Sequence, residues 1–322
     1  MTIIVRKDIL MLSRVALLVA GLLLAGTVAG VEKPHPSLTL ICPYQTAMTR
    51  GLAVHGDLDA PPAINTLIVN VIDGKLPQVR RQLDAMSPAD AAHWRQSVLV
   101  IAAYARNSAM VAGLLDNGAL VDGQGTLPGL NRKVRDQLMA EVKKDPKWAT
   151  VDPEPKTGRL LDTVLLFDGR PDGPVATIAA QCGDLATLDV ALDHHANVKA
   201  RIPHSNDVMV MAVTADNPAI VKRLLDHGAD PSRVLAGSSD GLITAIVDGN
   251  ATMVKLLLDH GADPCVENRS RQQRLDAYRA KHPGQKRPLV SDAELGRRRK
   301  LPEDLVARLT CPTFDMASAH KD

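Results

Sequence analysis

Aromatic residues are scarce in this chain. Phe, Trp and Tyr together make up 2% of its 322 residues, although apolar residues make up 45%. Its abundant Ala, Leu and Val suit thin helical layers that pack face to face, each touching only its neighbours. A strong net charge is also absent, since the formal charge at pH 7 is +2. This balance argues against a nucleic-acid-binding protein, which usually carries a strongly basic field.

Signatures of catalytic and metal-binding sites are missing as well. The sequence has no nucleophile elbow, glycine-rich phosphate loop or zinc-protease helix motif, and its four cysteines show no CxxC spacing. His194, His227 and His260 recur 33 residues apart. A constant spacing of this kind is typical of repeated helical units that stack on one another, and equivalent residues of stacked units lie about 10 Å apart. One zinc ion, with Zn–N distances of about 2.1 Å, does not span that separation. We therefore expect these histidines at helix C-termini, and predict no metal, no cofactor and no enzymatic activity.

The N-terminus has the features of an export signal. Basic residues precede an apolar run at 15–25, and small residues follow at Thr27 and Ala29. This pattern predicts a signal peptide over residues 1–29, cut after Ala29, with Met11 as an alternative start. A retained anchor is the competing interpretation, although the run is shorter than the roughly 20 residues that span a bilayer. We expect a periplasmic or secreted protein, or, with the helix uncleaved, one anchored in the inner membrane facing the periplasm.

Export would place the four cysteines in an oxidising compartment. Cys265 and Cys311 bracket the C-terminal segment and are disulfide candidates that would attach it to the last repeat. The loop-entropy model assigns such a bond about 4 kcal/mol. Cys42 and Cys182 lie far apart along the repeats and are expected to stay free. For all four, a small buried apolar residue is the alternative role.

One segment occurs in the sequence several times. LLDNGALVD, ALDHHANVK, LLDHGADPS and LLDHGADPC place Gly118, His195, Gly228 and Gly261 at equivalent positions, the last three 33 residues apart. Each unit has a short apolar helix, a polar break and a second helix with one apolar stripe, ended by the turn residue. No unit buries its stripe alone, so stacking supplies stability. Five units are predicted, at about residues 65–88, 97–122, 174–199, 207–232 and 240–265.

Two short antiparallel helices, a GAD-type turn and a 33-residue period resemble ankyrin repeats. The resemblance implies an all-α ankyrin-repeat solenoid of about five helix-turn-helix repeats with short hairpin turns. The family's TPLH opening is replaced by SVLV, PVAT, DVMV and DGLI, so the Thr and His hydrogen bonds that tie neighbouring repeats are expected to be missing. His195 stands at a glycine turn position, where a positive φ predicts a weak point.

The predicted repeats, at residues 63–122 and 174–268, are interrupted and flanked by other segments. Residues 30–62 are expected to form an N-terminal cap. The insertion at 123–173 combines a predicted helix over 131–144 with a Pro-rich linker. Insertions in repeat proteins often emerge on the binding face, and an inert spacer or a degenerate extra repeat is the alternative.

Residues 269–322 are predicted to form a basic C-terminal cap. Eleven Lys and Arg residues lie between Arg269 and Lys300. A solvated terminal segment accounts for them, and a patch for an acidic partner or acidic lipid is the alternative. LPEDLVARL at 301–309 resembles the start of another first helix.

Recognition is the function that remains. In ankyrin-like stacks, partners usually contact the hairpin tips and the concave face of the first helices. The resemblance thus implies binding of another protein, with no nucleic acid, and with a membrane only if the N-terminal helix is retained. Aromatic residues often anchor interfaces, and packing is the alternative role for both aromatic candidates. The candidate partner-binding residues are Trp94, Gln96, Tyr104, Gln181, Arg201, His204, Asn206, Thr214, Arg233, Ser238 and Asp248.

The sequence therefore predicts a non-catalytic interaction scaffold of the cell envelope: an adaptor, inhibitor or immunity-like factor. A pre-formed surface of this kind loses little entropy on binding. A membrane-anchored structural ankyrin protein is the alternative. An enzyme built on the insertion at 123–173 is supported by no motif.

Overall fold

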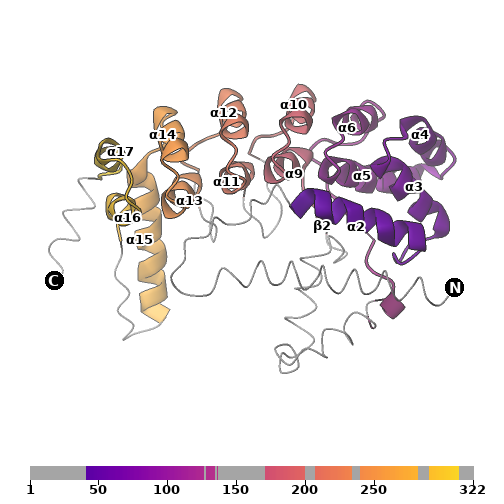
Figure 1. The fold of residues 1–322 in the computed structure, drawn as a ribbon, viewed down its shortest axis with the longest axis horizontal. Helices are drawn as coiled ribbons and strands as arrows, with labels where there is room; N and C mark the ends of the chain where they lie inside the picture. The colour runs from indigo at the N-terminus through magenta and orange to yellow at the C-terminus, as the bar shows by residue number, and fades with distance from the viewer. Residues whose placement is uncertain are drawn as a thin grey trace. The chain divides into compact units, whose positions relative to one another are not determined.

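The computed structural model describes residues 41–126, 128–134, 136, 171–199, 207–233, 240–281 and 290–311. The chain divides into two compact units, unit 1 (residues 1–173) and unit 2 (residues 174–322), and each is considered by itself (Figure 1). Helices dominate both units, and the described strands form one small sheet. The predicted signal peptide and most of the insertion lie outside the described residues.

The described residues of unit 1 include two helix pairs and one separate helix. The pairs are α3 (Pro62–Ile72) with α4 (Leu76–Asp84), and α5 (Pro88–Tyr104) with α6 (Ser108–Leu115). Residues 30–62 were expected to cap the end of the stack, but helix α2 (Ile41–His55) packs across the first helices α3 and α5. Figure 1 shows α2 on the side of α3 and α5 that faces away from the second helices α4 and α6.

Helix α5 has 17 residues, more than the other described first helices, and a side-chain cap marks its N-terminus. The Ser87 hydroxyl accepts a hydrogen bond from the Asp90 amide and donates one to the Asp90 carboxylate, and Pro88 occupies a position where no amide hydrogen is required. The helix therefore starts about nine residues before the predicted unit at 97–122.

The insertion starts and ends at a two-stranded ribbon. Strand β1 (Gly125–Thr126) pairs antiparallel with β2 (Pro171–Asp172) and packs against α5. A Cβ at Gly125 would lie 2.6 Å from the Gln96 carbonyl oxygen, so only glycine allows this approach. Beyond the ribbon, residues 132–134 are helical after Asn131, whose side chain caps them. The rest of the helix predicted at 131–144 is outside the described residues, except residue 136.

The part of unit 2 that the structure describes contains a stack of four helix pairs. The first helices pack on one another in sequence order, and so do the second helices, so the main contacts of each pair are with its neighbours. A longer helix lies between the third and fourth pairs and extends beyond the row of first helices (Figure 1). The elements are α9 (Val175–Gln181), α10 (Leu185–Asp193), α11 (Val208–Thr214), α12 (Pro218–Asp226), α13 (Gly241–Val247), α14 (Ala251–Asp259), α15 (Pro264–Lys281), α16 (Asp292–Arg298) and α17 (Glu303–Arg308).

The interpretation of residues 301–309 as a first helix is wrong. Helix α17 is the second helix of the last pair, because it packs on α14 while α16 packs on α13. Lys300 has φ 58° at the turn between α16 and α17, as Asp216 has φ 51° between α11 and α12. The C-terminal cap thus contains a further repeat-like pair, whose first helix is too rich in charged residues to show an apolar pattern.

The turns after α6, α10, α12 and α14 have the predicted left-handed residue, which is Gly118 (φ 88°) in the first of them. His195 has φ 62°, at the position where Gly228 and Gly261 have φ 82° and 90°. A side chain at such a φ is strained, whereas glycine is not. His195, at which the sequence predicts a weak point of the stack, therefore has a strained backbone conformation.

Other residues bond neighbouring repeats where the Thr and His hydrogen bonds of the family were expected to be missing. Asp207 and Asp240 replace the usual Thr and cap α11 and α13 through bonds of 2.9 and 2.8 Å to the Val210 and Ile243 amides. Two of the hydrogen bonds between repeats come from asparagine amides at the helix-helix turns. These are Asn217 Nδ2 to the Gly183 carbonyl oxygen (3.3 Å) and Asn250 Nδ2 to Asp216 Oδ1 (2.6 Å).

The cysteines are oxidised. Cys265, at the start of α15, and Cys311, just after α17, form a disulfide. The expectation that Cys42 and Cys182 stay free is contradicted, because both are disulfide-bonded and the described residues contain no free cysteine.

Candidate protein-interaction surface

In unit 1, the face formed by the first helices is covered by α2. Thr46 Oγ1 donates to the carbonyl oxygen of Tyr104 over 3.0 Å, and Met48 and Leu52 are buried in the same contact region. Tyr104 itself is only 4% exposed. The prediction that Tyr104 contacts a partner is therefore corrected, because this side chain is part of the core of unit 1.

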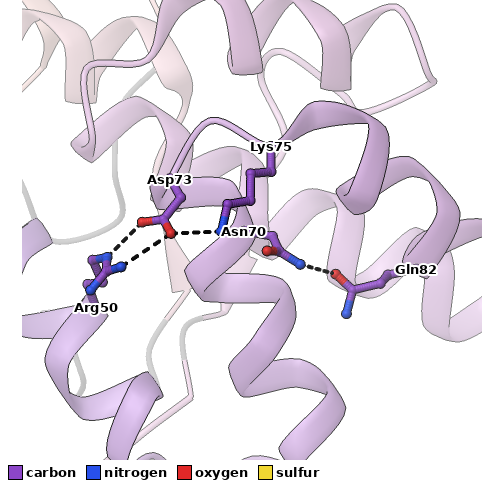
Figure 2. Close-up of polar contacts among 5 residues, drawn as sticks. All are labelled: Arg50, Asn70, Asp73, Lys75 and Gln82. Carbon is purple, nitrogen blue, oxygen red and sulfur yellow. Dashed lines mark hydrogen bonds and ion pairs between the residues drawn. The ribbon is translucent and has the colours of Figure 1, made fainter.

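An ion-pair cluster holds α2 in place (Figure 2). The Arg50 guanidinium donates to both Asp73 carboxylate oxygens, at 2.7 and 3.2 Å, and Lys75 Nζ lies 3.1 Å from the same carboxylate. The hydrogen bond from Arg50, followed by that from Lys75, lowers the pKa of Asp73 to about 2. This ion pair joins α2 to the turn after α3, in addition to the packing of α2 on α3 and α5.

Gln96 organises the loop after the second repeat. Its amide donates to the Leu120 carbonyl oxygen and accepts from the Leu120 amide, both at 3.0 Å. Gln96 therefore has a structural role. It holds the backbone of Leu120, whose own side chain is 69% exposed to solvent. No pattern in the sequence singles out Leu120. Trp94, the other aromatic candidate, is half-buried with its ring edge-on to His93 at 4.9 Å.

In unit 2, the last residue of each first helix forms a row that we call the first-helix face. Thr214 and Val247 are exposed, the latter by 41%, and Gln181 is half-buried. The same position in the last pair is Arg298, which is exposed. The last residue of the first helix is thus uncharged in three pairs and positively charged in the fourth. Of the predicted contacts, Gln181, Thr214 and the neighbouring exposed Asp248 lie on the first-helix face or beside it.

Arg233 links successive repeats. Its guanidinium donates to the Lys199 carbonyl oxygen over 2.6 Å and lies 3.8 Å from the Asp207 carboxylate. Burial raises the pKa of Asp207, while the Val210 amide and Arg233 oppose that shift. The positive charge of Arg233 therefore partly offsets the effect of burial on the Asp207 carboxylate, so Arg233 has a structural role. The predicted contacts Arg201, His204, Asn206 and Ser238 lie outside the described residues.

On the opposite face of unit 2, which is formed by the second helices, charged side chains of neighbouring helices form ion pairs with one another. Arg223 bonds to Asp189 of the preceding pair at 3.0 Å, and Arg308 bonds to Asp259 at 2.9 Å. His227 and His260 place Nδ1 2.8 Å from carbonyl oxygens of the last helical turn, as predicted for helix C-termini. Within the described ranges, no group of three His, Cys, Asp or Glu side chains is arranged to hold a metal ion.

A family model described as ankyrin repeats, in three copies, matches residues 175–268. Residues 175–268 are ankyrin repeats. The three repeats are the pairs α9–α10, α11–α12 and α13–α14, and the pairs of unit 1 and the α16–α17 pair have the same helix-turn-helix form. The protein is accordingly an all-α repeat protein.

A similar solved structure is the ankyrin repeat domain of Bcl-3, described as a member of the IkappaB protein family. The match has 20% sequence identity, a TM-score of 0.46, and covers 78% of this chain and 98% of that one. No curated protein matches the sequence. In the part of the chain that the structure describes, no helix has the length and apolar character needed to cross a membrane.

Proposed function

We propose that this protein is a non-catalytic scaffold that binds a partner protein through the first-helix face and hairpin tips of unit 2. Ankyrin repeats generally mediate protein–protein interactions. The observation that carries the proposal is the difference between the two units. In unit 1 the helix α2 occupies the corresponding face, whereas in unit 2 the side chains of Thr214 and Val247 are exposed.

The face is pre-formed, which supports a recognition role. Asp207 and Asp240 cap the first helices, Asn217 and Asn250 cap the second helices, and the two asparagines also tie the pairs together. A surface fixed in this way loses little conformational entropy when a partner binds. The uncharged side chains along it also carry a small desolvation cost.

We further propose that the protein acts in the cell envelope after export, as an adaptor, inhibitor or immunity-like factor. The disulfide-bonded state of all four cysteines supports an oxidising compartment. Retention of the N-terminal helix as an anchor is the alternative, and it leaves the recognition face unchanged. The mature N-terminus, sequenced from soluble and membrane fractions, separates the two: a start at residue 30 in the soluble fraction supports export with cleavage.

Site-specific cross-linking tests the proposed face. A photoreactive residue replaces Thr214 on the first-helix face or, as a matched control, Ala219, an exposed residue of the second helix α12. Each protein is produced in its native host, irradiated and purified from an envelope extract. We expect one protein cross-linked at position 214 and not at 219. Equal cross-linking at both positions, or cross-linking at 219 alone, would contradict the proposal.

A further inference from the structure

Charge is distributed unevenly along unit 2. Residues 174–263, which contain the three ankyrin repeats, have six Lys and Arg against eleven Asp, with no Glu. Residues 264–311, which contain α15 and the α16–α17 pair, have twelve Lys and Arg against six Asp and Glu. The stack is therefore acidic over its repeats and basic over its last pair. A ligand on the first-helix face experiences opposite potentials at the two ends.

The exposed cations are concentrated where α16 ends. Arg297 and Arg298 share a single carboxylate, Glu294, at 3.2 and 2.8 Å. Arg299 and Lys300, both exposed, make no ion pair within the described ranges. We call these four residues, 297–300, the basic end. Two of these residues stabilise a neighbouring anion: the hydrogen bonds from Arg298 and Arg297 lower the pKa of the Glu294 carboxyl group.

The basic end is continuous with the first-helix face. Arg298 occupies in α16 the position that Val247 occupies in α13 and Thr214 in α11. The Cβ of Arg299 lies next to Gly249, 3.9 Å from where a Cβ on that residue would be, so the cations begin at the turn of the preceding repeat. A single extended segment can contact the uncharged row and the basic end together.

We infer that the basic end binds an acidic segment of the partner protein, with the uncharged part of that segment directed along α13 and α11. The inference rests on the proposed function and defines the partner's chemistry. Carboxylates match guanidinium groups in geometry as well as charge. A membrane surface matches less well, because amphipathic lipid binding needs large apolar side chains beside the cations, and Val247 is the single large exposed apolar side chain among the described residues of unit 2.

Fluorescence anisotropy with the full chain tests this inference. The probe is a labelled peptide in which acidic residues alternate with valine and serine, and its control has amides in place of the acids. The test variant is Arg298→Gln/Arg299→Gln/Lys300→Gln. The matched variant, Lys199→Gln/Lys222→Gln/Lys255→Gln, removes three exposed cations elsewhere in unit 2. Each exposed charge contact contributes about twofold to fivefold, so we expect the test variant to weaken binding by about tenfold or more.

The matched variant should bind the acidic peptide as the wild type does, and added salt should weaken both. Equal losses in the two variants, or no binding of the acidic peptide by the wild type, overturn the inference. If the protein binds phosphatidylglycerol vesicles but not the peptide, the basic end is a membrane-binding site. If the protein self-associates in a salt-sensitive way, the basic end binds a second copy of the chain. Either result overturns the inference. If the peptide measurements overturn the inference but the test variant still forms the cross-link at position 214, the proposed function stands on its own.

Discussion

Removing the Cys265–Cys311 disulfide should loosen the last helix pair while the preceding pairs stay folded. The bond joins residues separated by 46 positions, and α16 and α17 lie entirely within that loop. The loop-entropy model assigns about 4 kcal/mol to closing a loop of this length. Without the bond, packing on α13 and α14 is what holds the pair, since the main contacts of each repeat are with its neighbours.

The variant Cys265→Ala/Cys311→Ala removes this bond alone, and native-state hydrogen exchange measures the result. Buried Leu305 and Val306 of α17 report on the last pair, and buried Val213 of α11 is the internal control. A loss of about 4 kcal/mol lowers protection in α17 by about a thousandfold. Protection at Val213 should change little, because local opening of an end pair leaves distant pairs folded. Unchanged protection in α17, or an equal loss at Val213, would refute this reasoning.

Three further predictions concern single side chains. His195→Gly should stabilise unit 2 by about 1 kcal/mol, because glycine adopts the positive φ without strain; a lower midpoint in thermal unfolding would contradict this. Asp240→Ala should destabilise by about 1 kcal/mol through loss of the α13 cap, measured by urea unfolding. The pKa of Asp73 falls from 3.8 to about 2 on folding, so its stabilisation is complete above about pH 4 and is lost as pH falls toward 2. Asp73→Asn should therefore lower stability by about 1 kcal/mol at neutral pH and by progressively less toward pH 2, which urea midpoints across this range would show.

The ankyrin repeats were predictable because their signal is local and repeated. Leu224 and Leu257 recur 33 residues apart in equivalent apolar stripes, and glycine turns follow both. The same reasoning failed for α16, whose sequence DAELGRR has one large apolar residue. Its identity as a first helix comes from packing on α13, which is a tertiary contact that no local pattern encodes.

The recognition face was only partly predictable for a similar reason. Thr214 and Tyr104 both end first helices, so the sequence treats them as equivalent. They differ because α2 packs over α5 and buries Tyr104. Gln96 likewise resembles a free polar contact until its amide is seen to bond Leu120 on both sides. Exposure at equivalent positions depends on which segment covers them, and this information lies far away in the chain.

The most direct test of the central claim is the affinity of the captured partner for two matched arginine variants. Thr214→Arg/Val247→Arg adds two charges to the first-helix face, and Ala219→Arg/Thr252→Arg adds two at exposed positions of the second helices. Because all four positions are exposed, both variants should keep the wild-type melting temperature. The account predicts a loss of affinity of about tenfold or more for the first variant and less than about twofold for the second. Equal affinities for the two variants, or a larger loss for the second, would contradict the assignment of recognition to the first-helix face.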